Sequence, residues 1–473
     1  MTNRPPRILL VCIEFAQPLF SGNGVLTQNI VWGLLMLGYE VTVICALPLS
    51  HRSSPTGDGN GNTTGSSSKG RALTLNKYID DSNLLQIRVI HVPDEYWKRL
   101  DRQSCWEIIA KEAPNMLLSD GGDGNNGGNG GDALGLPDHD HAHDHVFAID
   151  WSALPAIYNM QNAGILPRTV KLTYFIFRVF TASKELCRSQ MDYNFYLEHE
   201  MRGIQRADSV ILLSHVDQHA ILKQIDSMNM KTNTNMQKLS STCTRSGREE
   251  IISKMHILVP PLRKDIQSLA MNTKSNIAST GSVSNTELQV EGFMYILCNA
   301  RLSPEKNALR FAQVMQALSQ NGTLERLNLI PLMIGSICDE NYAQEVYRLL
   351  PSNSIIINHF LSSIDMSVHL KKTLLNVHPS IYDAYGMTIP EAAAFGVPSI
   401  LHHESIGATS LLRDDHDEVF LGDMSSVDSA IQSVEEMLLG GLDIMQAVGR
   451  NARKRALSWG VVDYTNSLRD KLV

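Results

Sequence analysis

The first fifty residues alternate between strand and helix patterns, and this alternation limits the possible fold more than any other feature. Residues 7–12 (RILLVC) form a continuous apolar run, which is typical of a strand buried on both faces of a parallel sheet. Apolar residues then recur at helical spacing over 25–37, and Gly38 follows as a stop signal. A second apolar run at 40–46 completes a strand–helix–strand unit. The pattern predicts a doubly wound α/β sheet with parallel strands.

A second α/β pattern begins at residues 293–298 (FMYILC), after a stretch rich in Ser, Thr and Asn. Four further apolar runs, separated by helical segments, are predicted as strands: 329–334, 354–359, 374–378 and 397–401. With 473 residues the chain is long enough for two or three domains. We therefore expect two Rossmann-like domains that face a central cleft, where ligands of such folds bind.

The expected boundaries follow the changes in composition. We predict an N-terminal domain over 1–267, a linker over 268–290, a C-terminal domain over 291–455, and a helix over 456–473 that packs back on the N-terminal domain. Three low-complexity insertions are expected in the N-terminal domain, at 52–70, 119–145 and 229–250. They hold too few apolar residues to offset the entropy of ordering them.

Composition narrows the class of protein. The net charge of −8 and the pI of about 6.1 argue against a general nucleic-acid binder, which needs a basic surface. Seven scattered cysteines without a CxxC pair fit a reducing compartment. No run of 18 apolar residues and no convincing signal sequence is found, so a cytoplasmic protein is expected, with peripheral membrane contact left open. The Asp/His-rich tract at 138–145 is interpreted as solvated, and no metal site is expected.

The first segment with chemical potential follows the predicted strand 293–298. Ser303 is expected to cap a helix whose first residue is Pro304. Arg301 and Lys306 would then flank a helix N-terminus, which favours an anion such as a diphosphate. A capped surface helix with a solvated Arg and Lys is the alternative.

The second segment, residues 379–398, carries two carboxylates on either side of a glycine-containing loop. Asp383 and Glu391 are eight positions apart, and both are expected to face the cleft. Carboxylates accept paired hydrogen bonds from vicinal hydroxyls, which a ribose or a hexose offers. The alternative is structural, with Thr388 and Glu391 forming a capping box and Asp383 serving as a turn residue.

The third segment is the glycine-rich turn Gly22-Asn23-Gly24, through which backbone can approach a phosphate. The dinucleotide fingerprint G-x-G-x-x-G fails because Thr27 stands at its third glycine, which argues against a nicotinamide dehydrogenase. A simple flexible turn is the alternative. The run 172–180 (LTYFIFRVF), with Arg178, is expected to be buried core rather than a membrane-facing or acceptor-facing patch.

Together these segments resemble family 4 of the retaining glycosyltransferases (glycosyl transferases group 1), which have the GT-B fold. Residues 301–307 resemble the signature G-R-L-x-x-x-K-G, and 383–391 match the spacing of the E-x7-E motif. Residues 20–24 resemble the P-x-x-G-G-x-G loop, and 207–214 (ADSVILLS) resemble the strand A-D-x-V-I-x-x-S.

The resemblance implies transfer of a sugar, a hexose being expected, from a nucleotide diphosphate sugar with retention of anomeric configuration. No metal and no other cofactor would be needed, and the acceptor would be a glycan, a lipid or a small molecule. It implies that Arg301 and Lys306 hold the diphosphate, and that Asp383 contacts the transferred sugar. The remaining donor-binding positions that it implies are Glu391 for the ribose and, for the phosphates, Gly22, Gly24, Gly386 and Met387.

The sequence departs from the family pattern at several positions. Asp383 is one methylene shorter than the first Glu, and Ala300 and Asn307 replace the two glycines of the signature. Residues 146–151 (VFAIDW) resemble an H-x-H-D-W stretch without its histidines, which leaves Asp150 as the acceptor-side candidate. A catalytically inactive sugar-nucleotide-binding protein and a phosphorylase or epimerase on the same fold are the competing hypotheses.

Overall fold

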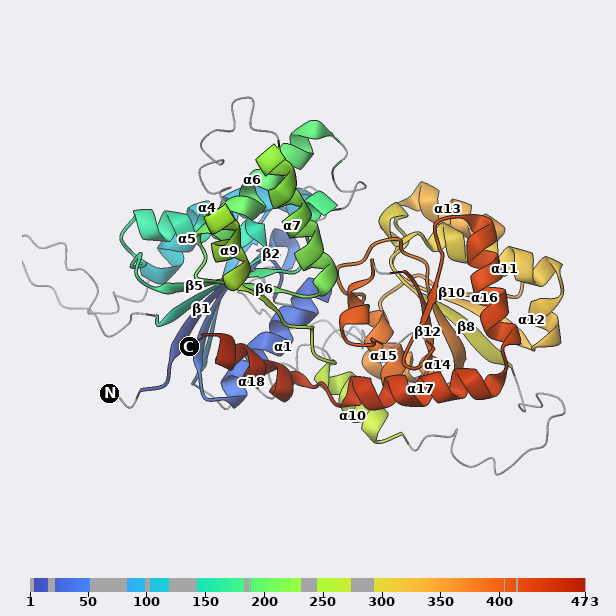
Figure 1. Ribbon diagram of the computed structural model, residues 1–473. Helices are drawn as coiled ribbons and strands as arrows, with labels where there is room; N and C mark the ends of the chain where they lie inside the picture. Colours follow the sequence, from blue (N-terminus) through green and yellow to red (C-terminus); the bar gives the residue numbers. More distant parts are fainter. Residues whose placement is uncertain are drawn as a thin grey trace, which may run out of the picture.

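The chain folds into two α/β lobes side by side (Figure 1). The computed structural model describes residues 4–15, 22–51, 83–97, 103–118, 143–182, 187, 189–230, 245–273, 293–403, 405–413 and 416–472. The predicted insertion 52–70, most of the other two insertions and most of the linker lie outside these residues.

The N-terminal lobe is built on a seven-stranded parallel sheet with the order β3-β2-β1-β4-β5-β6-β7. Its strands are β1 Arg7–Val11, β2 Glu40–Pro48, β3 Leu85–Val92, β4 His145–Ile149, β5 Lys171–Ile176, β6 Ser209–Leu212 and β7 Met255–Ile257. Its helices are α1 Gly22–Met36, α3 Asp94–Trp97, α4 Gln103–Leu118, α5 Leu154–Asn162, α6 Gln190–Arg206, α7 His215–Met230 and α9 Arg245–Ser253. The strand order reverses between β1 and β4.

The C-terminal lobe has a six-stranded parallel sheet with the order β10-β9-β8-β11-β12-β13. Its strands are β8 Met294–Asn299, β9 Leu329–Ile334, β10 Ile355–Ile357, β11 Thr373–His378, β12 Ser399–His402 and β13 Phe420–Gly422. Its helices are α11 Ala308–Gln320, α12 Thr323–Arg326, α13 Glu340–Leu349, α14 Ser363–Leu370, α15 Thr388–Ala394, α16 Val427–Leu439 and α17 Leu442–Leu457. The reversal here falls between β8 and β11, so the predicted pair of doubly wound parallel sheets is confirmed.

Burial on both faces explains the continuous apolar runs of the central strands. In β1, Leu9 and Val11 enter one core cluster, whereas Ile8 and Leu10 enter the cluster on the opposite face. All four side chains are fully buried. A strand with helices on both sides has no polar face, which is why the sequence of β1 does not alternate.

The C-terminal helix α18 (Val461–Leu472) returns to the N-terminal lobe (Figure 1). Its side chains Tyr464, Leu468 and Leu472 are buried in the same cluster as the β1 residue Ile8. The helix lies so close to α1 that a Cβ atom at Gly33 would stand 1.9 Å from the Thr465 hydroxyl. The last twelve described residues therefore complete the core of the first lobe.

Two crossings of the chain between the lobes lie next to each other. The indole Nε1 of Trp459 donates to the carbonyl of Val259 over 2.9 Å, and the backbone N–H of Leu262 donates to the carbonyl of Trp459 over 3.1 Å. Helix α10 (Lys264–Met271) follows the first crossing and packs on the second lobe through Ile266. The two crossings are thus joined by hydrogen bonds into one connection.

Three predicted boundaries need correction. Residues 268–271 belong to α10, although they were assigned to the linker. Residues 245–250 belong to α9, within the segment expected to be a disordered insertion. His145, assigned to the 119–145 insertion, begins β4, and Asp144 accepts a hydrogen bond from the backbone of Arg7 at 2.8 Å. In each case short polar residues obscured an element that packs on the domain.

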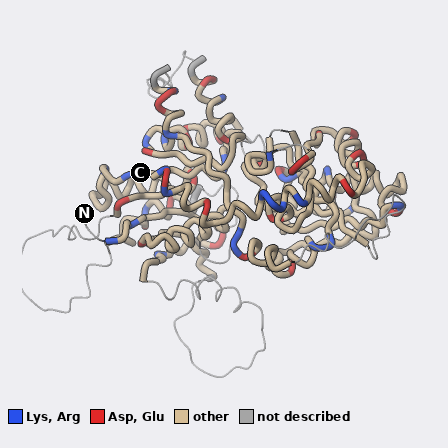
Figure 2. Tube along the Cα trace, turned by 60° about the horizontal axis from the view of Figure 1, so that its bottom comes forward, with Lys and Arg blue, Asp and Glu red and all other residues tan. Residues whose placement is uncertain are grey.

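The charged residues are distributed over both lobes. Figure 2 shows Lys and Arg positions interspersed with Asp and Glu positions along the two domains. Within the described part of the chain, no helix has the length and apolar character needed to cross a membrane. The same residues contain no group of three or more His, Cys, Asp or Glu side chains arranged to hold a metal ion.

Candidate active site

A cavity of about 330 Å³ lies between the two lobes. The N-terminal lobe contributes the start of α1 and the residues after β5, and the C-terminal lobe contributes the loops after β8, β9, β10 and β11. The cavity therefore borders the β8/β11 reversal of strand order, where doubly wound folds bind ligands. Of the predicted site residues, Gly22, Arg301, Lys306, Asp383, Gly386, Met387 and Glu391 line it.

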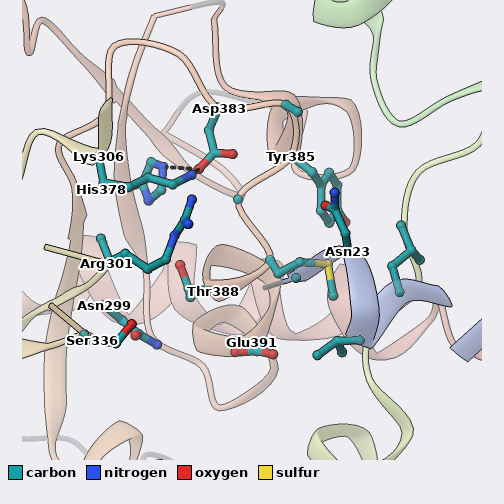
Figure 3. A pocket seen from close by; sticks show the side chains of 18 of the residues that line it. Asn23, Asn299, Arg301, Lys306, Ser336, His378, Asp383, Tyr385, Thr388 and Glu391 are labelled. Carbon is teal, nitrogen blue, oxygen red and sulfur yellow. Dashed lines mark hydrogen bonds and ion pairs between the residues drawn. The ribbon is translucent and has the colours of Figure 1, made fainter. Parts of the chain in front are cut away.

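A buried ion pair stands at the centre of the cavity wall. The Nζ of Lys306 lies 2.6 Å from the Oδ2 of Asp383, and the two side chains are 13% and 8% exposed. The Nε2 of His378 is 3.2 Å from the same oxygen, without the geometry of a hydrogen bond. Figure 3 shows these three side chains together, with Arg301 pointing towards them. The structure thus brings together two residues that are 77 positions apart in the sequence.

The backbone around Asp383 is fixed from both sides. Its N–H donates to the carbonyl of Ser405 over 3.2 Å, and its carbonyl accepts from the N–H of Gly407 over 2.9 Å. A Cβ atom at Gly407 would meet the carbonyl oxygen of Ala384 at 1.8 Å, so only glycine allows this approach. The carboxylate is therefore held in place by bonds that do not involve its side chain.

The local structure that carries Lys306 differs from the prediction. Residues Pro304–Lys306 form a single 3-10 turn, and α11 begins only at Ala308. The side chain of Ser303 makes no capping hydrogen bond, so the expected capped helix at Pro304 is wrong. The segment is a turn because Asn307 has φ of 52°, in the left-handed region, which interrupts the helix.

The conformation of Asn307 explains its place in the signature. Asparagine is among the few non-glycine residues that adopt this region readily. Its side-chain Nδ2 also donates to the carbonyl of Pro379 over 3.0 Å, which ties the Lys306 segment to the Asp383 segment. The replacement of glycine by asparagine therefore keeps the backbone conformation and adds a bond between the two halves of the site.

Burial and charge act against each other in the central pair. Burial alone would raise the pKa of Asp383, but Lys306 and His378 hold it well below its usual range. Burial lowers the pKa of Lys306, and nearby Arg178 and Arg301 add to this effect while Asp383 opposes it. A carboxylate and an ammonium group facing a ligand site are thus each stabilised chiefly by the other.

Arg301 lies beside a carboxylate of its own. Its Nη2 is 3.4 Å from the Oε1 of Glu305, and both side chains are largely buried. Burial would raise the pKa of Glu305, but Arg301 and hydrogen bonds hold it below its usual value. Glu305 was not among the predicted site residues, because a Glu in the first turn of a helix is ordinarily a surface residue.

Glu391 has a cationic partner that the sequence analysis missed. The Nη1 of Arg263 lies 3.2 Å from the Oε1 of Glu391, and the same guanidinium bonds Asp265 and the hydroxyl of Ser363. Burial raises the pKa of Glu391, although Arg263 opposes this rise. The capping-box alternative is wrong, because Met387 stands at the N-cap and Glu391 pairs with Arg263 instead.

The glycine segments meet across the cavity. A Cβ atom at Gly22 would stand 3.5 Å from the Cγ of Met387, so α1 of the first lobe approaches the loop of the second. Gly386 has φ of 80°, a conformation suited to glycine. Gly22 and Gly24 are not in a turn but begin α1, and Gly24 is buried and does not line the cavity. Among the described residues of this segment, Gly22 and Asn23 reach the site.

Asp150 occupies a separate position. It lines a smaller cavity of about 70 Å³ next to the main one, and its φ of 58° is unusual for a non-glycine residue. Its Oδ1 accepts from the backbone N–H of Phe177 at 2.8 Å, and its Oδ2 accepts from Asn23 at 3.0 Å. Asp150 therefore joins the end of β4 to the residue after β5 and to the start of α1.

Arg178, expected in buried core, lines the main cavity. The neighbours Phe177 and Val179 are buried as expected, but Arg178 between them is only partly buried. The signal available in the sequence was its place after the C-terminal end of a buried parallel strand, where functional side chains gather.

The lobes also touch through a buried polar contact beside the cavity. The hydroxyl of Tyr382 donates to the Oδ1 of Asp217 over 3.0 Å, and the hydroxyl of Ser214 donates to the Oδ2 over 3.0 Å. Burial raises the pKa of Asp217 to about 8, although these hydroxyls and Arg178 oppose the rise. Asp217 is therefore largely protonated at neutral pH.

Comparison with known proteins agrees with this architecture. Residues 284–455 match the family model described as glycosyl transferases group 1. The C-terminal domain belongs to this family. The match covers Arg301, Lys306, Asp383 and Glu391, so the residues at the wall of the cavity lie inside the group 1 domain. No curated protein sequence matches the chain.

Solved structures extend the likeness to both lobes. A sucrose-phosphate synthase from Thermosynechococcus elongatus is similar over 98% of both chains, with 11% identity and a TM-score of 0.61. An α,α-trehalose-phosphate synthase (UDP-forming) from Burkholderia xenovorans, in complex with glucose-6-phosphate, matches over 99% of both chains with 11% identity and a TM-score of 0.63. HepE from Anabaena, in complex with UDP and glucose, matches over 99% of both chains with 14% identity and a TM-score of 0.57. The group 1 domain is thus one half of a GT-B fold.

Proposed function

We propose that this protein transfers a hexose from a nucleoside diphosphate sugar to an acceptor hydroxyl, with retention of anomeric configuration. The observation that carries the proposal is the Lys306–Asp383 pair, 2.6 Å apart, in a cavity that also contains Arg301. Cations suit a diphosphate, and a carboxylate suits the hydroxyls of a sugar. The UDP and glucose bound to HepE of Anabaena, which has the same fold, support this choice of donor class.

The roles follow from the position of each side chain. Arg301 and Lys306 hold the diphosphate, and Asp383 exchanges its contact with Lys306 for hydroxyls of the transferred sugar. Glu391 binds the ribose, because one carboxylate has acceptor positions left after pairing with Arg263. Backbone N–H groups at Gly22, Gly386 and Met387 complete the phosphate contacts, and Phe360 and Leu361 offer an apolar surface for the base.

Retention is explained by attack from the face of the leaving group. The bond between the anomeric carbon and the diphosphate oxygen breaks first, and positive charge develops on the sugar ring. The acceptor oxygen then bonds to the same face of the anomeric carbon, and its proton passes to the departing phosphate oxygen. Arg301 and Lys306 stabilise the negative charge that grows on the diphosphate, which is the largest charge change of the reaction.

The first test is release of a nucleoside diphosphate by the purified full chain. Each of a panel of nucleotide sugars is offered with glycan, lipid and small-molecule acceptors, in buffer with and without EDTA. We expect one donor to be cleaved at the same rate in both buffers, because protein cations take the place of a metal. The configuration at the anomeric carbon of the product, read from proton NMR coupling constants, should equal that of the donor.

The matched variants are Lys306→Ala and Lys371→Ala, since Lys371 is exposed on α14's far end. Loss of Lys306 should lower kcat/KM by about 30- to 1000-fold, corresponding to 2–4 kcal/mol, and Lys371→Ala should leave it unchanged. Binding of a nucleotide sugar without any nucleotide release would assign the chain as a silent binding protein. A requirement for inorganic phosphate would favour a phosphorylase instead.

A further inference from the structure

The charges that line the cavity do not balance, and the excess lies on one residue. Among the described lining residues, each carboxylate has a cation beside it: Asp383 with Lys306, Glu305 with Arg301, and Glu391 with Arg263. Arg178 is the remaining cation of this set. No residue in the described part of the chain forms an ion pair or hydrogen bond with its guanidinium.

This distribution matters for a diphosphate. A nucleoside diphosphate carries at least two negative charges, and it gains a further one when the sugar leaves. The carboxylates beside Arg301 and Lys306 offset part of the attraction that these two cations exert. Arg178, which no carboxylate neutralises, gives the cavity its net positive charge.

The position of Arg178 is well determined by its neighbours. Phe177 and Val179 are 2% and 0% exposed and belong to core clusters on opposite faces of the sheet. The backbone N–H of Phe177 is held by Asp150 at 2.8 Å. With both neighbours buried and the backbone tied to β4, the guanidinium group has little choice but to project from the end of β5 into the cavity.

We propose that Arg178 supplies a third cation to the diphosphate, from the N-terminal lobe, opposite Arg301 and Lys306. The inference rests on the proposed function, and it deepens that function by making leaving-group stabilisation depend on both lobes. The geometry favours the diphosphate over an acidic acceptor, because Arg178 is near enough to Lys306 and Glu305 to shift the pKa of each downwards. A cation close to both diphosphate-binding segments faces the same anion as they do.

Arg178 also reports on the closeness of the lobes. It lies within electrostatic range of Asp217 and Tyr382, the two residues that form the contact between the lobes. If the lobes separate, Arg301 and Lys306 stay on the second lobe whereas Arg178 moves away with the first. The full cation set therefore forms only in the closed arrangement, which limits cleavage of the donor to that state.

The test uses binding without an acceptor, so that catalysis does not enter. Calorimetry with the full chain first selects the tightest of UDP, GDP and ADP, and then compares this diphosphate with its own monophosphate. Arg178→Gln should weaken diphosphate binding by about 10- to 100-fold, since a charge-assisted hydrogen bond is lost, and should change monophosphate binding by less than about threefold. Arg178→Lys should recover part of the loss. Arg168→Gln, at an exposed arginine of the same lobe, should bind both ligands like the wild type.

The outcomes separate the two proposals. If the wild type binds none of the three diphosphates, the proposed function fails and this inference with it. If the wild type binds and Arg178→Gln binds the diphosphate equally well, only the role of Arg178 is overturned. An equal loss for diphosphate and monophosphate also overturns it, because Arg178 would then act through the structure of the site. Circular dichroism and melting curves of each variant confirm that the comparison is made between folded proteins.

Discussion

Replacing Lys306 by methionine tests the central ion pair directly. Methionine keeps the length and the apolar stem of lysine but removes the charge, so the carboxylate of Asp383 stays buried without its principal partner. We expect Lys306→Met to destabilise the C-terminal domain more than Lys306→Met and Asp383→Asn do together. Removing the second charge relieves the cost that the first substitution creates.

The magnitude follows from the geometry. Two unit charges 2.6 Å apart attract by about 6 kcal/mol at an effective dielectric constant of about 20, and desolvation cancels a large part of this. Breaking such a buried pair on one side costs about 3–5 kcal/mol, and the coupling in a double-mutant cycle should be roughly 2–3 kcal/mol. For a domain of this size the single variant should melt on the order of 10 °C lower than the wild type.

The assay is thermal unfolding of wild type, both single variants and the double variant, repeated between pH 4.5 and 8. With Lys306 present, the depressed pKa of Asp383 stabilises the fold above the ordinary carboxylate pKa and is lost as the pH falls. Without Lys306 the pKa of Asp383 rises, so the melting difference should narrow towards acid pH. Additive effects of the two substitutions, together with a difference that stays constant with pH, would refute the reasoning.

Two further predictions concern other parts of the site. Asp217 has a folded-state pKa of about 8, above its ordinary value, so it holds a proton that the unfolded chain releases; its contribution to stability is lost as the pH rises towards 8. Relative to the wild type, Asp217→Asn should therefore gain about 1.4 kcal/mol per pH unit between pH 5 and 8 in denaturant unfolding, and a flat difference would show that Asp217 is ionised. Asn307→Ala should lose about 1–2 kcal/mol, because alanine at φ of 52° is strained and the bond to Pro379 disappears, whereas Asn307→Gly should lose less. Equal losses for alanine and glycine, measured by the same unfolding, would argue against backbone strain at this position.

Much of the architecture could be predicted because parallel sheets leave a strong imprint on sequence. Continuous apolar runs, each followed by a helical pattern, indicated both sheets, and the strand ends located most of the residues that line the cavity. Position relative to a strand end is a local property, so Arg301, Lys306 and Asp383 were found without knowledge of their contacts. Their pairing was not predictable, since spacing along the chain says nothing about which side chains meet across β8 and β11.

The missed residues share a different cause. Arg263 and Arg178 come from segments whose neighbours are apolar, and periodicity assigns such segments to the core without asking where a single cation points. Ser303 fails for the opposite reason. Its local pattern matched a helix cap, but the left-handed backbone of Asn307 moved the helix start to Ala308. Local propensity was overridden where the loop had to bring Lys306 to Asp383.

The return of α18 to the first lobe has a consequence for anyone who wishes to produce the lobes separately. A fragment that ends before the group 1 domain lacks Tyr464, Leu468 and Leu472, and so exposes part of the apolar surface around Ile8. The order of residues along the chain and the division into folding units do not coincide. An autonomous N-terminal module, or a chimera that exchanges acceptor lobes between relatives, would have to carry residues 461–472 with it as a grafted helix. The group 1 domain, by contrast, can be cut at the crossing near Trp459 without losing a core residue of its own.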